Sequence, residues 1–208
     1  MRETTRLLLV RHGEVEEGFH RTFGGTIDMG LSTFGATQAA QTAGYLAGRL
    51  TIDKVYSSPM RRVRETIDPL VSRADVPDPV FSDHLREVDF GVWTGLRWEE
   101  VAERHGASAF DWLKHLEAES IPEAEPVSHF RERVSTALEM VVSDGRHRTN
   151  LVACHGGVIR MALSILLDIP LLVTERFEVD YASVTVVDIF PEKTDLQLLN
   201  HTPWRPLI

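Results

Sequence analysis

Three short apolar runs of the sequence lead into residues that could do chemistry on an anion. The runs and the residues after them are 7–10 with Arg11 and His12, 53–56 with Arg62, and 151–154 with His155. Planar guanidinium groups match the geometry of phosphate oxygens and keep their charge. Imidazole rings add further hydrogen-bonding nitrogens. If the fold brings these side chains together, they indicate a site for a phosphate-like oxyanion.

For the side chains to meet, the three runs must be neighbouring strands of one sheet. Their unbroken apolar character is typical of parallel strands that are buried on both faces. Helical patterns alternate with them, which predicts an α/β fold: a three-layer sandwich whose mostly parallel central sheet carries helices on both faces. Ligands of such sheets bind beyond the carboxyl ends of the strands. The arginines and histidines would converge there.

The helices of this sandwich have recognisable starts. Ser32 is a candidate N-cap for a helix over 33–49, and Ser58 is one for a helix that begins at Pro59, where the missing N–H costs nothing. An amino end near the site also favours an anion through its free N–H groups. Further elements are expected as helices over 128–143 and from about 158, a strand over 183–190 and an edge strand over 196–201.

Residues 86–126 contain less clear strand pattern than the rest of the chain. Two short helices are expected within 97–118, broken at Gly106, followed by a Pro- and Glu-rich loop at 120–126. We expect this segment, called the cap below, to lie over the carboxyl ends of the strands. With no linker or repeat in view, residues 1–208 are expected to form a single domain.

Composition limits the partners and the compartment. The formal net charge of −9 argues against nonspecific binding to nucleic acid or to an anionic membrane. The single cysteine, Cys154, allows no intrachain disulfide and reads as a small core residue in a reducing compartment. Neither a signal peptide nor a membrane span is expected, so we expect a cytoplasmic protein without a metal or other cofactor. The sequence leaves open whether the chain forms a homodimer.

Four motifs resemble those of the histidine phosphatase superfamily, also called phosphoglycerate-mutase-like. They are RHGE at 11–14, SSPMRR at 57–62, REVDFGVWTG at 86–95 and HGG at 155–157. One such tripeptide is a weak signal. Four motifs in the family's order, each at an expected strand exit or loop, are a strong one.

The resemblance implies a role for each residue. His12 would attack phosphorus as a neutral imidazole whose other ring nitrogen keeps its proton on a backbone carbonyl. Arg11 and Arg62 would hold the nonbridging oxygens, and His155, expected to be cationic beside a phosphate dianion, would donate another hydrogen bond. Glu87 would protonate the leaving alkoxide and later take a proton from water. The nearby carboxylates Asp83 and Asp89 are the other candidates for this acid. The arginines next to Arg62, Arg61 and Arg64, are expected on other faces of the helix, away from the phosphate.

The first loop departs from the family pattern. Gly18 stands where many members have an asparagine that helps to hold the phosphate, and His20 or Arg21 would compensate or be solvated loop residues. The resemblance also assigns substrate-binding backbone to three glycines, which are Gly24, Gly25 and Gly156.

The resemblance covers both hydrolysis and phosphoryl transfer. Mutases need a closing lid and extra cations for a carboxylate and a second phosphate, and the net acidic segment 109–126 lacks paired arginines. The expected activity is therefore a phosphomonoesterase that acts on a small-molecule phosphate ester through a phosphohistidine. Phosphoglycerate mutase-type transfer and α-ribazole phosphatase activity remain alternatives, and a non-catalytic scaffold is the least favoured. Aromatic residues of the cap either pack it or cover a ring-bearing alcohol.

Overall fold

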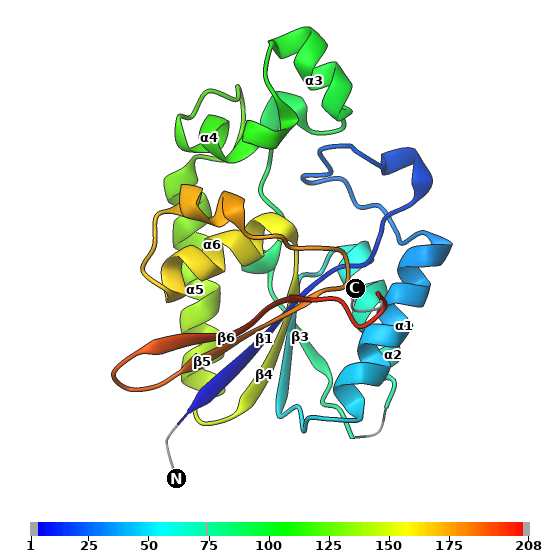
Figure 1. Ribbon diagram of the computed structural model, residues 1–208, viewed down its shortest axis with the longest axis vertical. Helices are drawn as coiled ribbons and strands as arrows, with labels where there is room; N and C mark the ends of the chain where they lie inside the picture. Colours follow the sequence, from blue (N-terminus) through cyan, green and yellow to red (C-terminus); the bar gives the residue numbers. More distant parts are fainter. Residues whose placement is uncertain (1–3, 74, 206–208) are drawn as a thin grey trace.

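The computed structural model describes residues 4–73 and 75–205. Its centre is a six-stranded sheet with the order β3-β2-β4-β1-β5-β6, in which β3, β2, β4 and β1 run parallel and β5 and β6 are antiparallel (Figure 1). The strands are β1 Thr5–Arg11, β2 Lys54–Ser57, β3 Pro79–Phe81, β4 Thr149–Cys154, β5 Val184–Ile189 and β6 Thr194–His201. The expected α/β sandwich is confirmed, including the edge strand that β6 forms.

Helices cover both faces of this sheet. The α-helices are α1 Thr33–Ala47, α2 Arg61–Val71, α3 Trp98–His105, α4 Trp112–Glu117, α5 Val127–Asp144 and α6 Gly156–Leu166. The 3-10 helices are η1 Glu17–Phe19, η2 Asp83–Leu85, η3 Gly91–Trp93, η4 Ala109–Asp111 and η5 Leu171–Arg176. None of the helices in the described ranges is long and apolar enough to cross a membrane.

Alternate residues of the central strands point to opposite faces of the sheet. Leu8 and Val10 of β1 pack in one cluster with α1 and α2, whereas Leu7 and Leu9 pack in the other with α5 and α6. This follows from the period of two in a strand, which turns successive side chains to opposite sides. The three leucines and the valine are all buried. The run is therefore apolar without a break, as is typical of a strand covered by helices on both faces.

The cap stands above the carboxyl ends of β1, β2 and β4, where α3 and α4 lie at the top of Figure 1. Helix α3 ends where the sequence predicts a break, because Gly106 adopts a left-handed conformation (φ 62°) after it. The buried side chains of the cap belong to the same cluster as α5 and α6. The cap is thus fixed to one side of the sheet.

Two local expectations were wrong, and one strand was missed. Helix α2 begins at Arg61 with Met60 as its N-cap, because Ser58 still pairs with Ala153 and keeps Pro59 outside the helix. Helix α6 begins directly after His155, two residues earlier than expected. Strand β3 was not predicted, since it is only three residues long and mostly exposed.

Candidate active site

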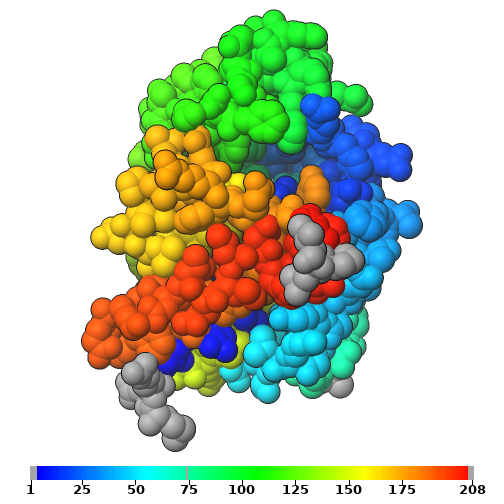
Figure 2. Space-filling view, in the orientation of Figure 1, coloured from blue at the N-terminus to red at the C-terminus, as the bar shows by residue number. Residues whose placement is uncertain are grey.

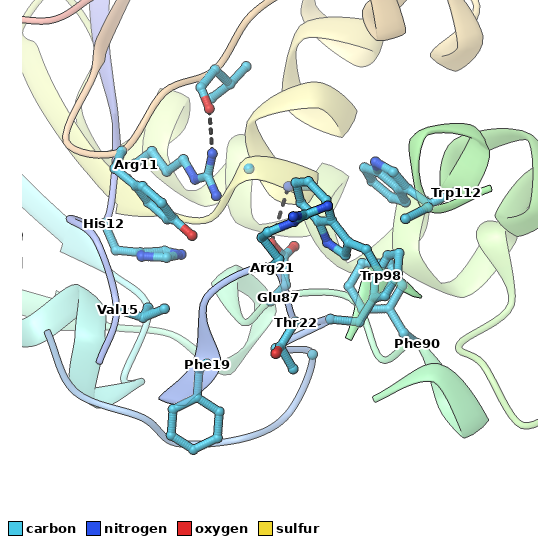
Figure 3. Close-up of a pocket in the computed structure, with 18 of the residues that line it drawn as sticks. Arg11, His12, Val15, Phe19, Arg21, Thr22, Glu87, Phe90, Trp98 and Trp112 are labelled. Atoms are coloured by element: carbon cyan, nitrogen blue, oxygen red, sulfur yellow. Dashed lines mark hydrogen bonds between the residues drawn. The ribbon is translucent and has the colours of Figure 1, made fainter. Parts of the chain in front are cut away.

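A cavity of about 410 Å³ opens between the sheet and the cap. Figure 2 shows it as a hollow bordered by the cap in green, the first loop in blue and the segment before β5 in orange. The floor includes Arg11, His12, Arg62 and Glu87 (Figure 3 labels all but Arg62). Because β2, β4 and β1 are neighbours, the three motif-bearing strand exits do meet at one edge of the sheet.

His12 is held as a neutral imidazole. Its Nδ1 lies 2.8 Å from the carbonyl oxygen of Gly13, which can only accept, so Nδ1 carries the proton. Burial lowers the pKa of His12 well below its usual value, and the charges of Arg62 and Arg11 lower it further. The remaining nitrogen, Nε2, therefore keeps its lone pair in a residue that lines the cavity.

Arg62 is buried beneath the cavity and fixed at three nitrogens. Its terminal nitrogens donate to the carbonyl oxygens of Ile27 (2.7 Å) and Gly25 (3.2 Å), and its Nε donates to Nδ1 of His155 (3.2 Å). Helix α2 thereby ties the first loop to the exit of β4. Desolvation lowers the pKa of Arg62, although the carboxylate of Glu87 acts in the opposite direction.

His155 is fully buried and uses both ring nitrogens inside the protein. Since Nδ1 accepts from Arg62, the proton must be on Nε2, which donates to Oγ of Ser58 at 2.9 Å. Burial lowers the pKa of His155 well below its usual value, and Arg62 adds to the effect. The ring lies 5.3 Å from that of His12 but does not line the cavity. Its expected contact with phosphate as a cation stays a prediction, and would require one of these bonds to be exchanged.

Arg11 projects from the end of β1 and stacks on Tyr181. Its Cζ lies 4.2 Å from the ring centroid of Tyr181, and one terminal nitrogen donates to the carbonyl of Val179 at 2.5 Å. Its Nε is buried and has no hydrogen-bond partner among the described residues. A buried donor without an acceptor costs free energy unless a ligand satisfies it. Gly156 packs against this guanidinium, since a Cβ there would lie 3.4 Å from Nε, at van der Waals contact.

Glu87 reaches the cavity from the loop after η2. Its Oε2 accepts from the backbone N–H of Gly157 at 3.2 Å, and its Oε1 accepts from the N–H of Val88 at 3.1 Å. The two competing carboxylates are engaged elsewhere and do not line the cavity: Asp83 pairs with Arg86, and Asp89 accepts from Gly91.

The first loop contributes both backbone and one charged side chain to the cavity. Gly24 and Gly25 both line the cavity, and Gly25 has a positive φ of 43° while its carbonyl holds Arg62. His20 does not line the cavity, since its ring is bonded to the carbonyl of Val15. Arg21 does line it, so Arg21, and not His20, is placed to compensate for Gly18.

Several residues that line the cavity or support it carried no signal in the sequence. Tyr181, Arg160 and Glu175 come from segments without a motif and reach the cavity only through the fold. Ser58, expected as an N-cap, holds His155 instead. As expected, Cys154 is a core residue: it is fully buried, and burial raises the pKa of its thiol. Arg61 and Arg64 lie outside the cavity on other helix faces, paired with Glu65 and stacked on Phe81 respectively.

Comparison with known sequences identifies the family. The sequence model of the histidine phosphatase superfamily (branch 1) matches residues 7–202. The chain belongs to this superfamily. Four residues of its motifs, Arg11, His12, Arg62 and Glu87, meet at the cavity floor, and His155 lies directly behind it.

Relatives of this superfamily member include proteins of different lengths. The bifunctional protein Rv2228c of Mycobacterium tuberculosis is 34% identical over 199 residues, and the match spans 95% of this chain but 54% of that protein. The chain thus spans about half the length of the curated relatives that it matches first. The putative phosphoserine phosphatase 2 of Hydrogenobacter thermophilus is 30% identical, with 94% and 95% of the two chains covered.

A solved structure confirms the fold. The product of the open reading frame Rv3214 from Mycobacterium tuberculosis superposes with a TM-score of 0.80 at 26% identity, covering 96% of this chain and 98% of that chain.

Proposed function

We propose that this chain hydrolyses small-molecule phosphate monoesters through a phosphohistidine at His12. The observation that carries the proposal is the neutral His12 ring, whose Nε2 lone pair is free beside the guanidinium groups of Arg11 and Arg62. Membership of the superfamily, and the name of the Hydrogenobacter relative, support the same activity.

The chemistry follows from these positions in two steps. In the first, Nε2 of His12 forms a bond to phosphorus, the bond to the ester oxygen breaks, and Glu87 gives that oxygen a proton. In the second, Glu87 takes a proton from water, whose oxygen displaces the imidazole and releases phosphate. Arg11 and Arg62 neutralise the charge on the nonbridging oxygens in both transition states.

Trapping of the intermediate tests this proposal. After a brief reaction with a ³²P-labelled ester, acid-labile label should map to the peptide with His12. His12→Asn should abolish both label and turnover, whereas His105→Asn, at an exposed histidine of α3, should change neither. Turnover by His12→Asn at the wild-type rate would refute the proposal. A non-catalytic scaffold is disfavoured because His12 and Glu87 both border the cavity.

The alternative, phosphoglycerate mutase-type transfer, would require more charged groups in the cavity than hydrolysis does. It needs cations for a second phosphate and a carboxylate, yet Arg21 already pairs with Glu99, and Arg160 lies among carboxylates. Hydrolysis makes no such demand. Isomerisation of phosphoglycerate faster than release of inorganic phosphate would favour the mutase.

We further propose that residues 1–208 act as one catalytic domain in the cytoplasm, without a nucleic-acid or membrane partner. The acidic net charge and the single buried cysteine support this assignment. Sedimentation equilibrium would decide whether the domain forms a homodimer.

A further inference from the structure

The outer part of the cavity has an aromatic wall made by the cap. Phe90, Trp98, Phe110 and Trp112 all line it, and Figure 3 shows three of these rings gathered on one side. They form two edge-to-face pairs, Phe90 with Trp112 and Trp98 with Phe110, each with ring centroids 5.4 Å apart. Phe110 is 76% exposed at the cavity mouth. Exposed aromatic surface beside a cavity is typical of a ligand-binding site.

This aromatic wall adjoins the proposed acid. A Cβ at Gly157 would lie 2.5 Å from Oε1 of Glu87 and 3.5 Å from Cη2 of Trp112, so both side chains stand over the same glycine. Glu87 gives its proton to the ester oxygen. In the proposed reaction, the group attached to that oxygen would then lie near the ring of Trp112.

Next to α4, η5 carries a carboxylate with an unsatisfied oxygen. Glu175 lines the cavity; its Oε2 lies 3.9 Å from Nζ of Lys114, and its Oε1 is buried with no hydrogen-bond partner in the described chain. A ligand N–H or O–H would satisfy this oxygen after a small shift of the side chain. Unsatisfied acceptors of this kind favour a donor on the ligand.

The cations of the outer cavity are already engaged. Arg160 donates to the carbonyl of Thr174, and the carboxylates of Glu178 and Glu175 lie close enough to influence its pKa, which desolvation lowers. Arg21 pairs with Glu99 at 2.6 Å. A second anionic group on the substrate would have to compete with these acidic residues.

We propose that the outer cavity binds the alcohol part of a ring-bearing phosphate ester that carries a hydrogen-bond donor, neutral or cationic, and disfavours alcohols with a second anionic group. The volume of about 410 Å³ is within the range of roughly 300–1,000 Å³ that is usual for ligand pockets. This inference rests on the proposed hydrolysis and names its substrate class.

A matched series of esters tests the inference. Benzyl, 4-(aminomethyl)benzyl and 4-carboxybenzyl phosphate share one ring and similar leaving groups, and propyl phosphate and 3-phosphoglycerate lack the ring. We expect kcat/KM to be about tenfold higher for the aminomethyl than for the carboxy ester. Glu175→Gln should remove most of that difference. Phe110→Ala should lower the ratio of benzyl to propyl phosphate about three- to tenfold.

The matched control is Phe81→Ala, because Phe81 is also an exposed phenylalanine but lies on β3 away from the cavity, and it should leave every ratio unchanged. A preference for 3-phosphoglycerate or the carboxy ester, or an unchanged ratio in Phe110→Ala, would overturn the inference while hydrolysis still stands. Absence of both turnover and phosphohistidine with every ester would overturn the proposed hydrolysis as well.

A second, independent observation concerns the loop that carries Glu87. Arg133 of α5 makes five hydrogen bonds: two to the carboxylate of Glu125, and one each to the carbonyl oxygens of His84, Arg86 and Glu87. The Arg133–Glu125 pair is nearly buried, with side chains 11% and 9% exposed. The geometry points to Arg133 as a positioning residue that fixes the backbone from which Glu87 reaches the substrate.

The dependence on the leaving group tests this role. Arg133→Lys should slow propyl phosphate about tenfold or more and 4-nitrophenyl phosphate much less, since a nitrophenolate leaves without a proton. Arg131→Met is the matched control on the same helix, because Arg131 is exposed and bonds to Ser164 instead. Equal slowing of the two esters would show a merely structural role and overturn the assignment.

Discussion

Replacing Gly157 with alanine would place a methyl group where the carboxylate of Glu87 lies. The new Cβ would be 2.5 Å from Oε1 and 3.3 Å from the carboxyl carbon, both closer than van der Waals contact allows. The end of a glutamate side chain is free to rotate away, so we expect the fold to survive and the carboxylate to move. General acid–base catalysis contributes about 10²–10⁴-fold, so kcat/KM for propyl phosphate should fall about 10²-fold.

The assay compares propyl phosphate with 4-nitrophenyl phosphate, whose leaving group needs little protonation and whose turnover should fall much less. The amount of trapped phosphohistidine measures the concentration of active sites in each variant. Gly44→Ala is the matched control, since Gly44 is also helical but has nothing within 4 Å of its added Cβ. It should keep full activity and gain about 0.5–1 kcal/mol of stability. Wild-type turnover of propyl phosphate by Gly157→Ala would refute the role assigned to Glu87.

The remaining predictions concern charge and burial. The pKa values of His12 and His155 are lowered in the folded state, so the unfolded chain binds more protons below about pH 6.5, and the free energy of unfolding should fall there by up to about 2.7 kcal/mol per pH unit. Urea titrations between pH 7.5 and 5 measure this slope, and a flat profile would contradict it. Burial raises the pKa of Cys154, so a thiol reagent should label it only after unfolding, and rapid labelling of the native protein would contradict its placement. Arg62→Lys cannot reproduce three bonds from a planar group and should cost about 10²-fold or more in kcat/KM, with the helical circular dichroism unchanged.

Much of the fold was predictable because short segments of the sequence carry clear patterns for individual strands and helix ends. The buried strand before Arg11 is an unbroken apolar run in the sequence, and the end of α3 is marked by a glycine, Gly106. Strand β3 has no such pattern, since two of its three residues are exposed and, among the described strands, it pairs with β2 only. The start of α2 was missed because pairing with β4 extends through Ser58, a tertiary effect that local capping rules do not contain.

The site was predictable where its residues belong to one of the four motifs or to the first loop. Arg11, His12 and Arg62 come to the cavity directly from a motif. Tyr181 and Glu175 reach it from the segment before β5, whose sequence pattern shows no active-site motif. Their position depends on β5 joining the far side of β1, which no short-range pattern predicts.

The close packing around Gly13 limits where this protein can change. Its carbonyl holds His12, its N–H donates to Oγ of Thr66, and a Cβ on it would lie 2.7 Å from the carbonyl oxygen of Gly35. His12, the proposed nucleophile, is therefore held in place between α1 and α2. Under the proposed function, a variant of this chain would therefore accept a new ester through changes on the opposite, cap-bearing side of the cavity, with His12 unmoved.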